Sequence, residues 1–157
     1  MKITIFTPTY NRAYILENLY RSLQRQTCHD FEWLIVDDGS LDDTETLAHS
    51  WMKDENSFSI RYYKQENGGK HTAINRGLEL AQGELFFTVD SDDYLTPDAL
   101  EKIKELKIVP VVVIKELSDA EPTLKALQEG GLPVAEITFR TACAADAIKL
   151  ACEKFPD

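Results

Sequence analysis

The chain has 157 residues, of which 43% are hydrophobic and 28% are charged, and its formal net charge is −10. This length favours one domain, and the mix of residue types is typical of a folded globular protein and not of a disordered one. The negative charge argues against nucleic acid and anionic lipid as partners, because both would repel the chain.

Strand-like and helix-like patterns alternate from one end of the chain to the other. The patterns predict strands at residues 3–7, 31–37, 60–64, 84–89, 108–114 and 133–139, and helices at residues 12–26, 42–54, 70–82, 97–106, 118–130 and 142–154. Such alternation indicates the α/β class, with helices covering a mostly parallel sheet. The first and fifth strands are apolar on both sides, as expected for parallel strands buried under helices.

We therefore predict a single α/β domain over residues 1–157. It is expected to be a three-layer, doubly wound, Rossmann-like sheet of about six strands. The first four strands should lie in the order 3-2-1-4. Strands five and six should extend the sheet beyond strand four, which would otherwise expose an unpaired edge.

Polar clusters follow three of the predicted strands. They occupy residues 7–12 after the first strand, 36–40 after the second and 90–93 after the fourth. Open α/β sheets bind ligands at the carboxyl ends of their strands. We therefore expect these clusters to share one site.

The third cluster suggests a divalent cation. Asp90, Asp92 and Asp93 lie so close in sequence that their negative charges repel one another and need a compensating positive charge. A divalent cation such as Mg²⁺ or Mn²⁺, which bridges carboxylates to substrate phosphates, usually supplies that charge. Asp90 and Asp92 would lie on the same side of an extended segment. A solvated acidic turn is the alternative for this cluster. Taken alone, residues 37–40 favour a turn and Tyr10 favours a core position.

Together these motifs resemble the nucleotide-binding half of a family 2 glycosyltransferase with the GT-A fold, over residues 1 to about 100. The stretches that carry the resemblance are residues 5–12, 34–40, 67–77, 81–84 and 89–93. The resemblance implies a site for a nucleoside diphosphate or a nucleotide sugar, with Mg²⁺ or Mn²⁺ as cofactor.

The resemblance also implies roles for particular residues. Pro8, Tyr10 and Asp38 would line the base pocket. Asp90 and Asp92 would form the D-x-D element, which touches the ribose and the metal-bound diphosphate. Lys70 or His71 would approach the donor, although His71 taken alone is typical of a surface histidine.

Residues from about 100 or 107 to 157 resemble a different family, the 2-keto-3-deoxy-6-phosphogluconate (KDPG) aldolases, over the first two βα units of their (β/α)₈ barrel. Residues 108–114, 126–131, 135–141 and 144–148 carry this resemblance. It implies that Glu136 is a proton-shuttling carboxylate and Arg140 a ligand for a substrate carboxylate, both near the carboxyl end of a strand. A structural or solvated role, such as an ion pair between them, is the alternative. The family's Schiff-base lysine belongs to a later strand, and Lys115 does not match it.

Both families accept a helix at residues 100–106, so we interpret the chain as a chimera joined within that helix. Its segments would be a glycosyltransferase-like part at 1–103 and an aldolase-like part at 104–157. No acidic base of the glycosyltransferase kind follows residue 106. We therefore expect a protein that binds a nucleotide diphosphate and a metal without full catalysis. The alternatives are a folding-only chimera with no ligand and an active family 2 glycosyltransferase.

The three cysteines, Cys28, Cys143 and Cys152, are widely spaced and form no C-x-x-C pair. A disulfide framework or a zinc site is therefore not expected. We predict a cytoplasmic protein, because free thiols suit a reducing compartment and no signal peptide precedes the first strand. No apolar run approaches the roughly 20 residues of a membrane span. The sequence leaves the oligomeric state open.

Overall fold

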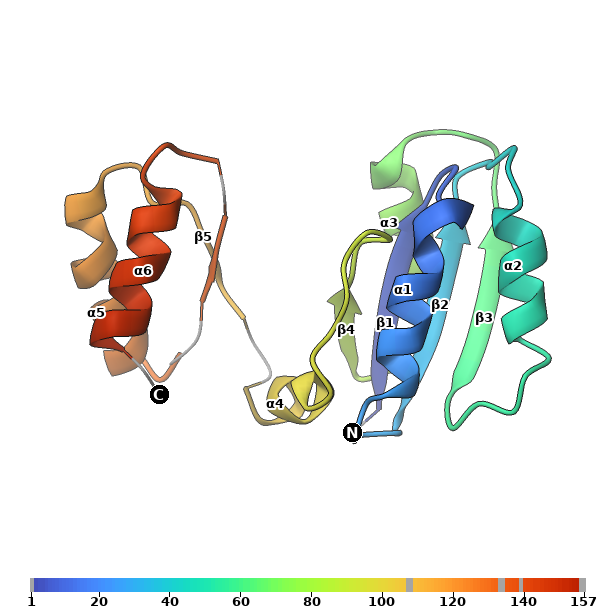
Figure 1. Ribbon diagram of the computed structural model, residues 1–157, viewed down its shortest axis with the longest axis horizontal. Helices are drawn as coiled ribbons and strands as arrows, with labels where there is room; N and C mark the ends of the chain where they lie inside the picture. Colours follow the sequence, from blue (N-terminus) through green and yellow to red (C-terminus); the bar gives the residue numbers. More distant parts are fainter. Residues whose placement is uncertain (1, 107–108, 133–134, 139, 156–157) are drawn as a thin grey trace. The chain divides into compact units, whose positions relative to one another are not determined.

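The computed structural model of the chain describes residues 2–106, 109–132, 135–138 and 140–155. The chain divides into two compact units, Met1–Lys104 and Glu105–Asp157, and the structure defines each unit by itself (Figure 1). Both units alternate strands with helices, which confirms the predicted α/β class. The single domain remains a prediction. Within the described ranges, no helix is both long enough and apolar enough to cross a membrane.

The first unit is built on a four-stranded parallel sheet in the order β3-β2-β1-β4, which confirms the predicted order. All carboxyl ends of parallel strands lie at one edge, so the loops that follow them can share one site. The elements are β1 (Ile3–Thr9), α1 (Ala13–Gln24), β2 (Phe31–Asp37), α2 (Thr44–Trp51), β3 (Ser59–Lys64), α3 (Lys70–Leu80) and β4 (Leu85–Thr88), followed by α4 (Ala99–Leu106), whose last two residues belong to the second unit.

Helices cover both faces of this sheet, because successive side chains of a buried strand point to opposite faces. Ile3 and Ile5 of β1 pack in the same cluster as Leu16 of α1, whereas Phe6 packs with Ala73 of α3. Gly77 allows α3 to approach β1 closely: a Cβ atom at this position would lie 2.3 Å from the Phe6 ring. The unit therefore has three layers, as predicted.

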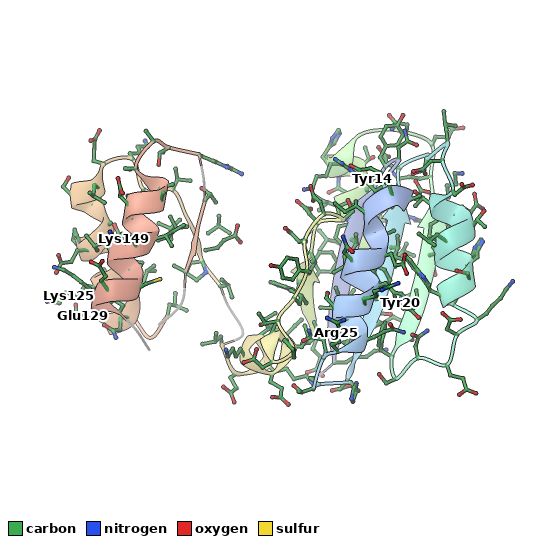
Figure 2. The ribbon with its side chains drawn as sticks, in the orientation of Figure 1. Tyr14, Tyr20, Arg25, Lys125, Glu129 and Lys149 are labelled. Atoms are coloured by element: carbon green, nitrogen blue, oxygen red, sulfur yellow. The ribbon has the colours of Figure 1, made fainter. Side chains whose placement is uncertain are left out.

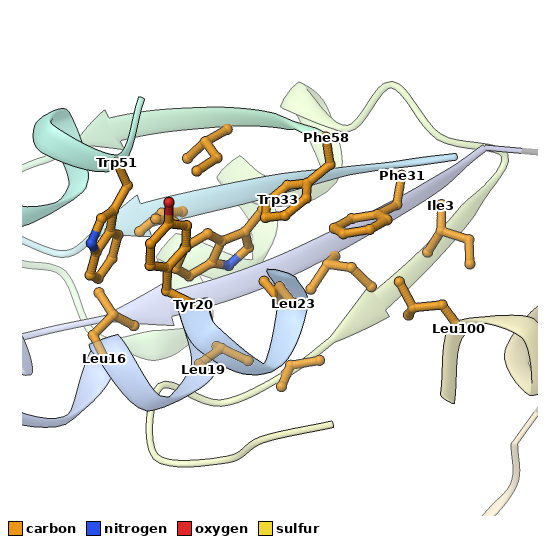
Figure 3. Close-up of a cluster of buried hydrophobic side chains, with 14 of the residues drawn as sticks. Ile3, Leu16, Leu19, Tyr20, Leu23, Phe31, Trp33, Trp51, Phe58 and Leu100 are labelled. Carbon is orange, nitrogen blue, oxygen red and sulfur yellow. The ribbon is translucent and has the colours of Figure 1, made fainter. Parts of the chain in front are cut away.

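Aromatic side chains form the centre of the larger core cluster (Figure 3). The rings of Tyr20 and Trp51 stack with centroids 4.6 Å apart, and those of Trp33 and Trp51 stack at 5.5 Å. The buried Trp33 indole also donates a hydrogen bond of 3.0 Å to the Thr7 hydroxyl. A buried indole N–H needs such a partner, so β1, β2, α1 and α2 are joined by one well-satisfied core.

The buried carboxylate of Glu32, in β2, connects this strand to β1 and β3. The side chain of Glu32 accepts hydrogen bonds from the Thr4 hydroxyl (2.7 Å), the Gln82 amide (2.7 Å) and the Arg61 guanidinium (3.0 Å). Burial works to raise the pKa of Glu32, but these bonds outweigh burial and hold the pKa below its ordinary value. Glu32 therefore stabilises the fold in its charged form.

The second unit contains a separate two-stranded parallel sheet, so the predicted six-stranded sheet is wrong. Strand β5 (Val111–Val112) pairs with β6 (Glu136–Ile137) and not with β4. Strands joined by a single crossover helix are commonly neighbours, and this pairing leaves β4 as an edge of the four-stranded sheet. The parts of the predicted strands at residues 108, 133–134 and 139 lie outside the described residues.

Among the residues that the structure describes, the helical elements of the second unit enclose a small core cluster. The buried residues of this cluster are Ile114, Ala120 and Ala147, while Val111 leaves 61% of its surface exposed. The helical elements are the 3-10 helix η1 (Leu117–Asp119), α5 (Ala120–Glu129) and α6 (Ala144–Lys154), and Figure 2 shows Lys125 and Glu129 one turn apart on α5. A unit as short as Glu105–Asp157 is expected to be marginally stable, because small domains bury a low fraction of their surface.

Candidate functional site

A cleft of about 500 Å³ opens at the carboxyl-terminal edge of the four-stranded sheet. Its volume falls in the range of small-molecule sites. The six residues predicted to bind nucleotide or metal all line it, whereas His71 does not. The lining residues are Pro8, Thr9, Tyr10, Arg12, Asp38, Asn67, Gly69, Lys70, Ala73, Asp90, Ser91 and Asp92.

The loops after β1 and β2 are fastened to each other at this edge. Asn11 adopts a left-handed conformation (φ 52°), its amide donates to the Ser40 hydroxyl (2.8 Å), and its side-chain oxygen accepts from the Leu41 amide (2.8 Å). The Asp42 carboxylate accepts a hydrogen bond of 3.0 Å from the amide of Ala13, the first residue of α1. The amino-terminal end of α1 is therefore already capped by a carboxylate.

Asp38 organises the segment that leads into α3. One carboxylate oxygen accepts from the Gly68 amide (3.0 Å) and the Gln65 side chain (2.7 Å), and the other accepts from the Gly69 amide (2.7 Å). Burial works to raise the pKa of Asp38, but these bonds lower it overall. Gly69 has a φ of 93°, which a side chain would strain. Asp38 thus shapes the wall of the cleft with both of its oxygens engaged.

The neighbouring Asp37 points into the protein and lies outside the cleft lining. It is fully buried, and its carboxylate accepts hydrogen bonds from the Ser40 amide (2.8 Å) and the Tyr62 hydroxyl. Burial, together with this carboxylate, raises the pKa of Tyr62. The Asp37–Asp38 pair therefore supports the loops on both sides, which agrees with the turn that residues 37–40 indicated.

Lys70 and Asp90 form an ion pair across the cleft lining. The Lys70 ammonium lies 2.7 Å from both carboxylate oxygens of Asp90, and the two side chains are 57% and 42% exposed. In the structure, the positive charge of Lys70 neutralises part of the acidic cluster. The sequence pattern predicts a metal ion in this neutralising role. Sequence reasoning missed the pairing because the partner comes from another element, at the start of α3.

Asp90 and Asp92 can hold a divalent cation only if a bound ligand supplies further oxygen atoms to that cation. Asp90 and Asp92 both line the cleft, yet no group of three or more His, Cys, Asp or Glu side chains is placed to hold a metal among the residues that the structure describes. Mg²⁺ is commonly held by one or two carboxylates together with substrate phosphates. The two aspartates therefore fit a cation that also contacts a bound diphosphate.

The sequence motif at residues 7–12 contained two further lining residues that were not singled out. Arg12 donates a hydrogen bond of 2.6 Å to the hydroxyl of Tyr14, which projects from α1 (Figure 2), and no carboxylate pairs with it in the described part of the chain. The buried Thr9 hydroxyl likewise has no hydrogen-bond partner among described atoms. A guanidinium without a carboxylate partner is suited to bind phosphate.

The aldolase-like residues do not form a comparable site. Glu136 is the exposed first residue of β6 and does not lie at its carboxyl end, because the described pairing with β5 begins there. Arg140 and Lys115 are also exposed. Within the described residues no ion pair joins Glu136 to Arg140, so the alternative of a solvated role describes both side chains.

The strand order, the cleft at the strand ends and its paired aspartates define the nucleotide-binding half of a GT-A glycosyltransferase fold. Residues 4–113 match the family described as Glycosyl transferase family 2, and the chain belongs to this family. Residues 100–157 match the KDPG and KHG aldolases. The two matches overlap over α4 and β5, which confirms the predicted chimera.

Similar proteins include both curated sequences and solved structures. The putative glycosyltransferase EpsH of Bacillus subtilis is 34% identical over 64% of this chain and 29% of its own length. The structure of S. aureus TarS in complex with UDP gives a TM-score of 0.62 at 27% identity, and covers 74% of this chain and 36% of that one. The mannosyltransferase PcManGT of Pyrobaculum calidifontis, in complex with GDP-Man and Mn²⁺, gives 0.62 at 25% identity over 78% and 38%. The chain spans about a third of the length of its curated relatives.

Proposed function

We propose that the first unit binds a nucleoside diphosphate, free or as a nucleotide sugar, together with Mg²⁺ or Mn²⁺, and that the chain does not complete sugar transfer. The observation that carries the proposal is the cleft. Segments at the ends of all four parallel strands converge on it and bring together an exposed aromatic ring, two cations and three aspartates. These are the groups that a base, a diphosphate and a metal would need.

The phosphates would be bound by side chains and not by helix ends. Helix amino-termini are common phosphate sites, but Asp42 caps α1 and Asp38 takes the amides that lead into α3. Arg12 and Lys70 remain as the cations that line the described cleft. Asp90 and Asp92 would hold the metal, which when bound withdraws charge from the diphosphate as a Lewis acid.

The base end of the ligand would lie against Tyr10. This ring is 46% exposed at the cleft and follows Pro8, which is buried. An exposed aromatic face beside a proline offers a surface on which a base can stack, which is worth about 1–3 kcal/mol per base in single-strand binding proteins. The similar TarS structure holds UDP and the similar PcManGT structure holds GDP-Man, so both bases belong in the test.

Complete transfer is not expected from this chain. Transfer to an alcohol needs a base for the acceptor's proton and a pocket that positions the nucleophile, and residues 100–157 match aldolases. Aldol chemistry in turn needs a lysine activated in a desolvated pocket, whereas Lys115 and Glu136 are exposed. Slow hydrolysis of the donor is the one exception, because water needs no acceptor pocket.

Thermal unfolding with millimolar UDP, GDP or TDP, each with and without MnCl₂, tests the binding proposal. At ten times the dissociation constant the stabilisation is about 1.4 kcal/mol, which corresponds to a rise in melting temperature of about 3–6 °C. Asp92→Ala should abolish the rise. The matched control is Asp93→Ala, because Asp93 is exposed and lies outside the cleft lining. The absence of a rise with all three nucleotides would favour the folding-only chimera.

Activity assays test the second part of the proposal. We expect no glycosylated product from labelled nucleotide sugars and candidate acceptors, and no adduct from pyruvate and borohydride. A metal-dependent product that disappears in Asp92→Ala would instead show an active glycosyltransferase. A borohydride-trapped pyruvyl-lysine would show aldolase chemistry.

The cellular setting also remains a prediction. Cys28, Cys143 and Cys152 are all free thiols in the structure, which agrees with a reducing compartment such as the cytoplasm. A net charge of −10 continues to argue against nucleic acid as a partner.

A further inference from the structure

The ion pair between Lys70 and Asp90 occupies the carboxylate that the proposed function assigns to a metal. The Lys70 ammonium lies 2.7 Å from each of the two Asp90 oxygens. Lys70 is the first residue of α3, and Asp90 follows β4. The contact therefore joins two walls of the cleft through the residue on which a cation would depend.

A cation cannot use Asp90 while Lys70 holds it. Asp92 is then the one cleft aspartate left for a cation among the described lining residues, and no other metal-ligating group gathers in the described part of the chain. A single carboxylate is a poor site for Mg²⁺ or Mn²⁺. The ammonium would also repel a dication at this position.

A diphosphate gives Lys70 an alternative partner. Both side chains of the pair are about half exposed, and ion pairs of this kind are weak. The lysine stem is flexible, and its ammonium can turn toward a phosphate without moving the helix. Asp38 already binds the Gly69 amide before α3, and Asp42 already binds the Ala13 amide of α1, so these two amides do not compete with Lys70 for the phosphates.

We propose that Lys70 is an exchangeable counter-ion that makes metal binding depend on the nucleoside diphosphate. Without nucleotide, Lys70 neutralises Asp90 and disfavours the cation. With nucleotide, the ammonium moves to the diphosphate and leaves Asp90 to the cation. This inference rests on the proposed function and adds cooperativity to it. By linkage, the metal and the nucleotide each raise the affinity of the protein for the other by the same factor.

Manganese titration of the full chain, followed by electron paramagnetic resonance without nucleotide, tests the first half of the exchange. Lys70→Met should bind Mn²⁺ about two- to fivefold more tightly than the wild type, which is the range expected when an exposed ion pair stops competing. Lys70→Arg keeps the charge and should resemble the wild type. Lys64→Met is the matched control, because Lys64 pairs with Glu45 at 2.9 Å with similar exposure and lies outside the cleft lining.

The same titration with UDP, and separately with GDP, tests the second half. The coupling factor is the Mn²⁺ dissociation constant without nucleotide divided by that with nucleotide. We expect this factor to fall about two- to fivefold in Lys70→Met and to stay unchanged in Lys64→Met. An unchanged Mn²⁺ affinity and coupling factor in folded Lys70→Met, checked by its melting curve and repeated in Lys70→Gln, would overturn the inference. A wild type that ignores both nucleotides refutes the proposed function instead, while the nucleotide-free titration still decides the role of Lys70.

Discussion

The two units follow the same local plan of a parallel strand followed by a helix, yet they differ in what the plan produces. The first unit has four paired strands and a core centred on Trp33, Trp51 and Tyr20. The second has two paired strands and a described core of one isoleucine and two alanines. The comparison teaches that βα units become a stable layer only when enough of them pair to bury both faces of the sheet.

The same difference separates the two candidate sites. In the first unit, four strand ends place Tyr10, Lys70 and Asp90 around one cleft. In the second unit, Glu136 begins the short strand β6, Arg140 lies beyond the end of this strand, and both side chains are exposed. Residues that resemble a catalytic pair therefore do not make a site when the strands that would complete it are not paired beside them.

Hydrogen exchange of the full chain tests the comparison most directly. Amides of β1 and β2 should be protected about 10³–10⁴-fold more than those of β5 and β6, because the small core of the second unit allows it to open locally at little cost. Mass spectrometry of peptides from both units gives the measurement. Equal protection in the two sheets would show that the second unit is held as firmly as the first.

Truncation of the aromatic core should have the next largest effect. Trp33→Ala is expected to cost about 3–5 kcal/mol of unfolding free energy, since it removes a fully buried ring and leaves the Thr7 hydroxyl without its partner. Urea denaturation followed by circular dichroism gives the measurement. Val111→Ala in the second unit is the control and should stay within about 0.5 kcal/mol, because Val111 is mostly exposed. A similar loss from both variants would contradict the comparison.

Acid should weaken the first unit through Glu32. Its pKa is lowered in the folded protein, so its contribution to stability is complete above the ordinary glutamate value of about 4.3 and is lost as the pH falls below it. Glu32→Gln should cost about 1–3 kcal/mol near neutral pH, and the difference from wild type should shrink below about pH 4. Urea denaturation between pH 3 and pH 7 measures both. Glu17→Gln, in an exposed pair with Arg21, is the control and should change little at any of these pH values.

The smallest effect should come from the aldolase-like residues. The double variant with Glu136→Gln and Arg140→Ala should change the unfolding free energy by less than about 0.5 kcal/mol, because both side chains are exposed. The nucleotide-dependent rise in melting temperature should also be unchanged. A loss of that rise would show that the second unit contributes to the site of the first.

Patterns that are local in sequence predicted most of the elements. Strand β2 falls at the predicted residues 31–37, and α3 begins at the predicted residue 70. In both cases the local strand-like or helix-like pattern marks the element directly. The cleft was also predictable to the extent that its residues follow strands, because the carboxyl ends of parallel strands meet at one edge.

Non-local contacts account for what the sequence did not reveal. An apolar run predicts a strand but not its partner, so β5 and β6 were assigned to the wrong sheet. The partner of Asp90 is a lysine from α3, and the acidic motif contains no sign of it. Asp38 lines the cleft, and its hydrogen bonds to the Gly68 and Gly69 amides are also contacts that its own motif does not contain. Such choices depend on which side chains the fold brings within reach.

The stacked indoles of the core give the comparison an optical reporter. Trp33 and Trp51 are the two tryptophans of the chain, and both lie in the first unit, 5.5 Å apart. Intrinsic tryptophan fluorescence therefore follows the melting of the first unit alone and does not detect the aldolase-like unit. Far-ultraviolet signals average the helices of both. If the two units unfold at different denaturant concentrations, the two spectroscopic transitions will separate, and a single unfolding free energy will no longer describe the chain.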